Sequence, residues 1–155
     1  EDLNADSIDL MELMMAAEET FGMDEVEESA MSGLKTVGDV YDKIEELGNA
    51  LYGGLNDLMQ KHGICGHVRG IGARFGIYFG MDNPEDDYDF RKIVAKYDAD
   101  AGAEFIGKML EQGVYLHTYG KSPYPNHNGF GITHTMDDIN YTLEAADKAL
   151  KSMRG

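Results

Sequence analysis

An apolar stripe at helical spacing runs through the first half of this chain and constrains its fold more than any other feature. The stripe is made of Val37, Val40, Ile44, Leu47, Leu51, Leu55 and Leu58. The glycines inside it, at positions 48, 53 and 54, each cost a helix about 1 kcal/mol relative to alanine, yet the period survives them. Because Thr36 is a suitable cap and the pattern changes after Gly63, we predict one long helix ending near His62 and joining two units.

The periodicity changes from helical to alternating after Gly63. Phe75, Ile77 and Phe79 alternate with other residues, which is typical of a strand with one buried face. Residues 67–71 are expected to be its partner strand, with a turn near Gly72. The other predicted elements are a helix over residues 101–112, strands over residues 114–117 and 130–133, and a final helix that opens at a capping box of Thr135 and Asp138. The predicted class is α+β: carrier-type helices, followed by a small α/β domain with a mainly antiparallel sheet.

Upstream of the long stripe, a shorter amphipathic pattern predicts an all-helical unit. Apolar side chains recur at helical spacing over residues 7–21, and the acidic ones lie mainly off that stripe. Asp6 and Ser7 are both suitable N-cap residues, and Gly22 is a suitable stop. A second, short helix is predicted over residues 25–31.

Acidic side chains are concentrated in the first third of the chain. The 155 residues carry a formal net charge of −16, and residues 1–48 hold 15 acidic and 2 basic side chains against 14 and 11 in residues 49–155. Such asymmetry favours two functional units. The acidic unit is expected to repel nucleic acid and anionic membranes and to attract proteins with basic patches.

Cysteine content and hydropathy set the expected compartment. The single cysteine, Cys65, cannot form an internal disulfide and fits a reducing environment. No apolar run approaches the roughly 20 residues of a membrane span, and the sequence shows no leader pattern. We therefore expect a cytoplasmic protein that binds neither membrane nor nucleic acid.

The acidic unit resembles the acyl carrier protein family. The stretches that carry the resemblance are DLNADSIDLMEL at residues 2–13, AEETFG at 17–22 and KTVGDV at 35–40, with Asn4 where the family signature usually has glycine. The resemblance implies that residues 1–47 are a partial carrier domain without its first helix, and that Ser7 attaches 4′-phosphopantetheine. The implied partners are a phosphopantetheinyl transferase and acyl-transferring or condensing enzymes. They would be met by Asp6, Ile8, Asp9, Glu12 and Glu18.

The physical chemistry of position 7 agrees with this role. A serine in the first turn of a helix is exposed, and a phosphodiester on its oxygen gains from the positive helix N-terminus. Acidic side chains along the same helix speed capture by basic enzymes. The alternative is that Ser7 is an N-cap and nothing more.

The rest of the chain resembles class III pyridoxal-phosphate (PLP) aminotransferases and is similar to glutamate-1-semialdehyde aminomutase. The blocks that carry this resemblance are LYGGLNDL at residues 51–58, GICGHV at 63–68, GARFGIYF at 72–79, MLEQGVYL at 109–116 and THTMDDINYTLEAAD at 133–147. They imply that residues 48–155 are the C-terminal small domain of such an enzyme. In that family the domain covers the active site, which implies contacts from the loops near Gly72 and Tyr119.

The catalytic groups of that family belong to a large domain. Its Schiff-base lysine, the acidic partner of the pyridine nitrogen and the phosphate-binding loop cannot be matched to this sequence, so no residue is assigned as catalytic. We expect this chain not to be catalytic by itself and PLP to belong to the parent enzyme. A homodimer through the aminotransferase part is also implied.

Together, the two resemblances predict the carrier–aminotransferase junction of a polyketide or lipopeptide (nonribosomal peptide) assembly protein. The leading hypothesis is a carrier that holds acyl groups as a thioester at Ser7, fused to an aminotransferase remnant. The alternatives are a part of a PLP-dependent aminotransferase or aminomutase, and a non-catalytic interaction module.

A metal site of His62, Cys65 and His67 has plausible spacing but no evident fourth ligand, so structural roles are favoured for these residues.

Overall fold

The computed structural model describes residues 11–12, 15–16, 19, 34, 36–118 and 120–153. By its contacts, the chain divides into two units, Glu1–Leu34 and Lys35–Gly155. The described residues 11–12, 15–16 and 19 are helical and fall within the helix predicted over residues 7–21. The other residues of that helix, and the whole of the helix predicted over residues 25–31, lie outside the described part. The boundary between the two family resemblances, at residue 47, stays a prediction.

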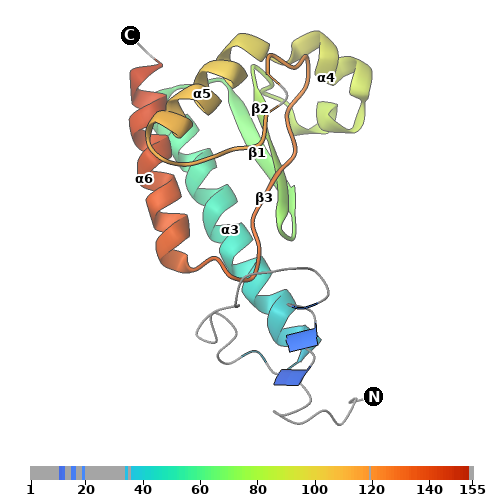
Figure 1. The fold of residues 1–155 in the computed structure, drawn as a ribbon. Helices are drawn as coiled ribbons and strands as arrows, with labels where there is room; N and C mark the ends of the chain where they lie inside the picture. Colours follow the sequence, from blue (N-terminus) through green and yellow to red (C-terminus); the bar gives the residue numbers. More distant parts are fainter. Residues whose placement is uncertain are drawn as a thin grey trace. The chain divides into compact units, whose positions relative to one another are not determined.

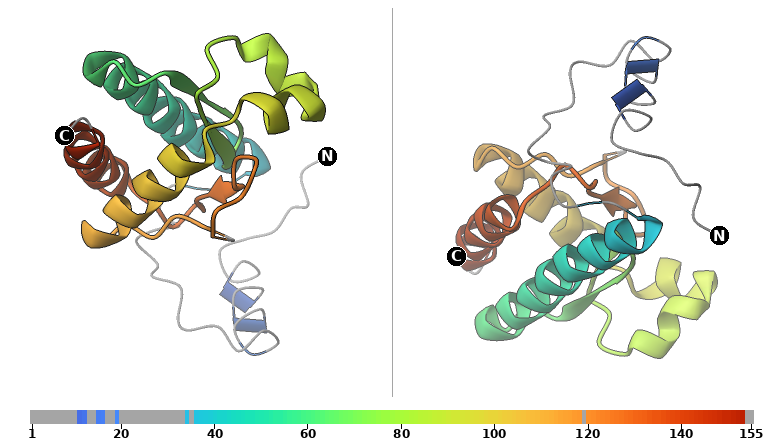
Figure 2. Two further views of the ribbon diagram at one scale, coloured as in Figure 1. Left: turned by 90° about the horizontal axis from the view of Figure 1, so that it is seen from above. Right: turned by 90° about the horizontal axis from the view of Figure 1, so that it is seen from below.

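The second unit has the predicted α+β fold (Figure 1). Its elements, in chain order, are α3 (Val37–His62), β1 (Gly66–Ile71), β2 (Arg74–Phe79), the 3-10 helix η1 (Pro84–Tyr88), α4 (Phe90–Lys96), α5 (Ala99–Glu111), β3 (Asn128–Gly129) and α6 (Met136–Ser152). In two further views, α3 and the hairpin of β1 and β2 lie between α6 and α4 (Figure 2). Among the described residues, no helix combines the length and the apolar character needed to cross a membrane.

Helix α3 is the longest element, and its sequence explains both of its ends. Thr36 caps the first turn by accepting from the Asp39 N–H, while the Asp39 carboxylate accepts from the Thr36 N–H, which is a capping box. The helix stops at Gly63, whose φ of 60° places it in the left-handed region that glycine adopts without strain. The predicted long helix is confirmed.

The buried face of α3 forms the centre of the core. It consists of the stripe residues Leu47, Leu51 and Leu55, continued by Met59. This face packs against α6 on one side and β1 on the other. Each such side chain contributes about 1.5–3 kcal/mol by leaving water. Phe79, Phe105 and Met109, from β2 and α5, complete the same cluster.

The sheet is antiparallel, with the strand order β1-β2-β3. In the hairpin His67 lies opposite Tyr78, and Arg74 lies between Ile71 on β1 and Gly129 on β3. The turn falls at Gly72, as predicted. Phe75, Ile77 and Phe79 are buried, which confirms the predicted strand and its buried face.

Two glycines of α3 allow close approaches rather than merely weakening the helix. A Cβ on Gly48 would lie 3.0 Å from the Gly72 carbonyl oxygen, and one on Gly54 would lie 2.6 Å from Leu143 of α6. Glycine at these positions therefore lets the hairpin turn and α6 come close to the α3 backbone. Gly53, in contrast, faces open space.

The C-terminal turn of α3 is tied to α6 by charge. Asp147 Oδ1 lies 2.7 Å from Lys61 Nζ and 2.8 Å from His62 Nε2. The hydrogen bonds from Lys61 and then from His62 lower the pKa of Asp147. His62 is buried, so this contact also supplies a polar partner for a side chain inside the core.

The predicted strands over residues 114–117 and 130–133 are wrong. Residues 114–118 have no strand assignment, because β2 is already flanked by β1 and β3, and β3 is too short to support a further strand. The strand expected at 130–133 occurs at Asn128–Gly129 instead. The His134 N–H donates to Gly131 O, and the Thr135 capping box opens α6 directly afterwards. Residues 131–134 are therefore needed for the turn into the helix.

The segment between β2 and α5 also differs from expectation. Residues 84–88 form the 3-10 helix η1, and residues 90–96 form α4; neither helix was predicted. None of the α4 residues is buried. Its seven residues are fewer than the roughly 11–18 over which helical periodicity can be judged from sequence.

We expect Gly53→Ala to raise the free energy of unfolding by about 0.5–1 kcal/mol, because alanine favours the helix and its methyl group meets no neighbour. Gly48→Ala is the matched control. Its methyl group would press on the Gly72 carbonyl oxygen, so the propensity gain should be cancelled. Urea denaturation followed by circular dichroism measures both. Equal stabilisation by the two substitutions would contradict this account of α3 packing.

Candidate functional site

A hollow of about 510 Å³ opens where β2 begins, beside the segment that follows α5 and the residues that lead into α6. Its lining residues are Arg74, Tyr115, Leu116, His117, His127, Asn128, Gly129, Phe130 and His134. None of these nine is acidic, although the chain as a whole carries a net charge of −16. The hollow is therefore a locally basic site on an acidic protein.

Arg74 is the fixed positive charge of this hollow. It is the first residue of β2, and its register partner is Gly129. A Cβ at position 129 would lie 3.2 Å from Arg74 Cδ, so glycine there leaves room for the arginine stem to lie across β3. Arg74 is exposed, and no acidic side chain among the described residues forms an ion pair with it. Its guanidinium therefore remains able to bind an external anion.

Three histidines add polar ring edges to the same hollow. His134 Nδ1 accepts the Gly131 N–H at 3.2 Å, and its ring meets Phe130 edge-on at 6.4 Å between centroids. With Nδ1 used as an acceptor, the hydrogen of a neutral ring lies on Nε2, which makes His134 a donor. His127 is exposed, and His117 is half-buried.

Asn128 lies at the buried side of the hollow. Its residue is 5% exposed, and its Nδ2 donates to Asn126 O at 3.3 Å. Its Oδ1 is buried and has no hydrogen-bond partner among the described residues. A buried carbonyl oxygen without a partner is unusual and marks a place where a donor would be stabilising.

The chemistry open to this site is the binding of a small anion. A guanidinium and imidazole N–H groups are donors suited to a carboxylate or phosphate. None of the nine lining residues is a lysine, so the hollow offers no amine for covalent attachment of PLP. Among the described residues, no group of three or more His, Cys, Asp or Glu side chains could hold a metal ion.

The structure brings together two of the loops that were expected to matter. Arg74 follows the turn at Gly72, and His117 precedes Tyr119, which itself lies outside the described residues. The nine lining residues were not predicted from sequence to form one site. One signal could have found it: residues 112–136 contain no Asp or Glu and hold three of the five histidines.

The residues predicted for the carrier unit are almost all outside the described part. Glu12 is the exception, and it is helical and exposed. Ser7, the predicted attachment point, is among those outside. The others outside are Asp6, Ile8, Asp9 and Glu18.

His62, Cys65 and His67 do not form a shared site. His62 contacts Asp147, whereas His67 contacts Asp87. Cys65 is a free, exposed cysteine. The two histidines, one at the end of α3 and one on β1, thus have separate carboxylate partners.

No family model matches this chain. Several solved structures share its fold. An ω-transaminase from Sphaerobacter thermophilus aligns with a TM-score of 0.58 and 18% identity, over 76% of this chain and 25% of its own. The FumI protein of Sphingopyxis sp. MTA144 aligns with a TM-score of 0.54 and 26% identity, over 73% of this chain and 22% of its own. An S-selective transaminase from Arthrobacter sp. aligns with a TM-score of 0.54 and 20% identity, over 75% of this chain and 26% of its own.

Two of these three neighbours are described as transaminases. The FumI structure is a PLP internal aldimine form, and a further neighbour is a transaminase with PLP bound. The chain spans about a quarter of the length of the structures it matches. It therefore has the fold of one part of these PLP-dependent enzymes, which bears out the aminotransferase resemblance at the level of fold. The carrier resemblance has no counterpart among these similarities.

We expect Arg74→Gln to weaken binding of inorganic phosphate to the hollow about tenfold, because hydrogen bonds to a charged group contribute about 1.5–3 kcal/mol. Titration followed by the NMR signals of the histidine rings measures the affinity. Arg91→Gln, on the exposed helix α4, removes the same charge away from the hollow and should change little. Equal losses in the two variants would mean that net charge, not this site, attracts the anion.

Proposed function

We propose that residues 48–155 are the small-domain part of a PLP-dependent aminotransferase similar to glutamate-1-semialdehyde aminomutase. The observation that carries the proposal is the shared fold with PLP transaminases, together with five sequence blocks in the order found in class III enzymes. This was the alternative hypothesis from sequence, and it now has the stronger support. The substrate of such an enzyme stays open.

The hollow gives this domain a specific task. Arg74 and the neighbouring imidazoles would hold an acidic group of the substrate in the hollow. Phe130 and Tyr115 would wall the same space and exclude water from it. Fixing one end of a substrate in this way restricts its orientation, which is a principal way in which binding energy accelerates a reaction.

The cofactor chemistry does not fit this hollow. When bound, PLP supplies an electron sink to the reacting amine. Five lysines of the described part form ion pairs with carboxylates instead: Lys61 with Asp147, Lys92 and Lys96 with Asp86, Lys108 with Glu104 and Lys121 with Asp100. We therefore assign no step of the cofactor reaction to the described residues. The large domain would supply that site.

Complementation tests this proposal. The ω-transaminase of Sphaerobacter thermophilus, shortened by the segment that this chain matches, should lack transamination by itself. Adding the full 155-residue chain should restore a complex that retains PLP and transaminates. Absorbance of the bound cofactor and amine transfer between donor and acceptor are the two measurements. Absence of any complex would contradict the assignment as a small domain.

The Arg74→Gln chain provides the matched control for the role of the hollow. It should form the complex and retain PLP but raise KM for an acidic substrate about tenfold. An unchanged KM would leave the small-domain assignment standing and remove the hollow from substrate binding.

We also propose, from sequence alone, that Ser7 carries 4′-phosphopantetheine and presents an acyl thioester. The motif at residues 2–13 and the acidic helix support it, and exposed Glu12 agrees with a partner-facing surface. The implied partners remain a phosphopantetheinyl transferase and acyl-transferring or condensing enzymes.

Mass spectrometry after incubation with coenzyme A and a phosphopantetheinyl transferase should show addition of one arm to the wild-type chain. The Ser7→Ala chain should show none, and Ser29→Ala, a serine outside the motif, should behave as wild type. A wild-type chain that gains no mass would end the carrier proposal. If the complementation test failed as well, a non-catalytic interaction module would be the remaining function.

A further inference from the structure

The hollow around Arg74 is larger than a single anionic group needs. Its volume is about 510 Å³, which falls within the range of about 300–1,000 Å³ of pockets that enclose whole small molecules. A carboxylate or phosphate bound to Arg74 would leave much of this space to water. A ligand that fills the hollow therefore has a body as well as an acidic group, and the lining side chains indicate the chemistry of that body.

Planar rings dominate the lining of the hollow. Five of its nine lining residues carry such a ring: Tyr115, His117, His127, Phe130 and His134. In the whole chain, Phe, Tyr and Trp together make up 10% of the residues, and histidine adds 5 residues among 155. The enrichment is therefore local. All five ring residues are exposed or half-buried, so a ligand in the hollow can reach them.

Phe130 is attached to the same strand end as Arg74. The Phe130 N–H donates to Ala73 O at 3.1 Å, directly before Arg74 in the chain. The Phe130 ring also lies 6.5 Å, between centroids, from the ring of Tyr52 on α3. The Tyr52 hydroxyl in turn donates to Gly72 O. These contacts hold the aromatic ring and the start of β2 in one frame.

His134 supplies a second ring in a fixed orientation. Its Nδ1 accepts the Gly131 N–H, and its ring meets that of Phe130 at an interplanar angle of 72°. Two rings that are already held in place lose little conformational freedom when a ligand binds between or against them. The hollow thus offers preformed aromatic surfaces of two orientations.

Tyr115 reaches the hollow from a different element. The Asp98 N–H donates to Phe79 O at 2.9 Å, so α5 begins beside the end of β2. The ring of Phe105 on α5 then packs against that of Phe79, at 5.4 Å between centroids. The segment that leaves α5 carries Tyr115 to the lining of the hollow. Tyr115 is 69% exposed, so much of its surface is available to a ligand.

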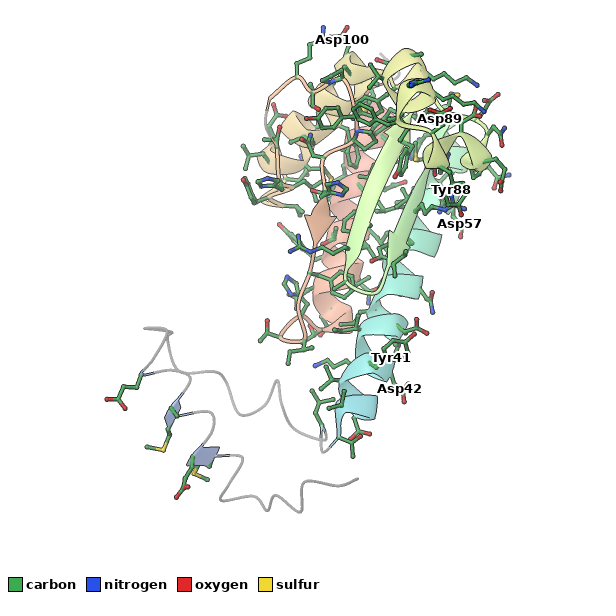
Figure 3. The ribbon with its side chains drawn as sticks, turned by 90° about the vertical axis from the view of Figure 1, so that its right-hand side faces the viewer. Tyr41, Asp42, Asp57, Tyr88, Asp89 and Asp100 are labelled. Atoms are coloured by element: carbon green, nitrogen blue, oxygen red, sulfur yellow. The ribbon has the colours of Figure 1, made fainter. Side chains whose placement is uncertain are left out.

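Arg74 determines that the ligand is an acid. The guanidinium suits a carboxylate or phosphate, because it donates two parallel hydrogen bonds to either. Figure 3 labels four aspartates, and they belong to other parts of the fold: Asp42 and Asp57 to α3, Asp89 to the start of α4 and Asp100 to α5. None of the four lines the hollow, so none of them competes with the ligand there.

We propose that the hollow binds a small aromatic acid, with its anionic group on Arg74 and its ring against Phe130, His134 and Tyr115. This inference rests on the proposed function, since it names the class of acid that the hollow takes. Aromatic rings gain from offset-stacked or edge-to-face contacts in addition to the gain from burial. A saturated ring gains from burial alone. The ring wall therefore selects aromatic acids over saturated acids of the same size.

Matched pairs of acids test this selection on the full 155-residue chain. Phenylacetate should bind about two- to tenfold more tightly than cyclohexylacetate, although the saturated ring is the larger apolar group. Phenyl phosphate should likewise bind more tightly than inorganic phosphate. Titration followed by the NMR signals of the histidine rings measures all four affinities. The tighter of the two aromatic ligands identifies the anionic group that Arg74 prefers.

Leucine substitutions separate the aromatic contacts from apolar volume. Phe130→Leu should remove the preference for phenylacetate and leave the affinity for cyclohexylacetate close to that of the wild type. Tyr115→Leu should reduce the preference as well, and its exposed position means that the fold does not depend on the ring. Phe90→Leu, on the exposed helix α4, is the control and should keep the full preference.

The outcomes distinguish this inference from the proposed function. Equal affinities for phenylacetate and cyclohexylacetate in the wild type, or a preference for cyclohexylacetate, would overturn the aromatic selection and leave the hollow as an acid-binding site. Binding of no acid, or equal losses in Arg74→Gln and Arg91→Gln, would remove the hollow from the proposed function and the inference with it. The complementation test of the small-domain assignment depends on neither result.

Discussion

The packing of the α3 stripe against both α6 and β1 sets the positions of the other elements in the second unit. Leu51 and Leu55 lie at the centre of this contact, and Gly48 and Gly54 let the hairpin turn and α6 come close to the helix backbone. The His62–Asp147 contact then fixes the far end of the helix pair. Because α3 packs against the hairpin, the position of the start of β2 is fixed. The position of the hollow around Arg74 is fixed with it.

Local signals explain why much of this fold could be predicted from sequence. The α3 stripe, the Thr36 and Thr135 capping boxes and the alternation in β2 each depend on residues a few positions apart. The errors have a different origin. Residues 114–117 look like a strand but have no edge to pair with, and α4 is helical without burying an apolar face. Pairing partners and burial are set by the whole chain, so a local pattern does not contain them.

The same limit applies to predicting the candidate functional site from local sequence patterns. Arg74, His117 and His134 are far apart in sequence and line one hollow because β3 pairs with the start of β2 shortly before α6 begins. No single motif joins them. None of the nine residues that line the hollow is acidic, which stands out against the net charge of −16. The carrier motif is the opposite case, since it is fully local, but its attachment residue, Ser7, lies outside the described residues.

The hydrogen bond between Asp98 and Phe79 has a consequence for how such a domain can vary. It joins the end of β2 directly to the start of α5, at the base of the segment between them. The two elements are therefore held together whatever the length of that segment. A change in its length would alter neither the sheet register nor the α3 contacts. Variation in length could therefore accumulate at this one surface without disturbing the sheet.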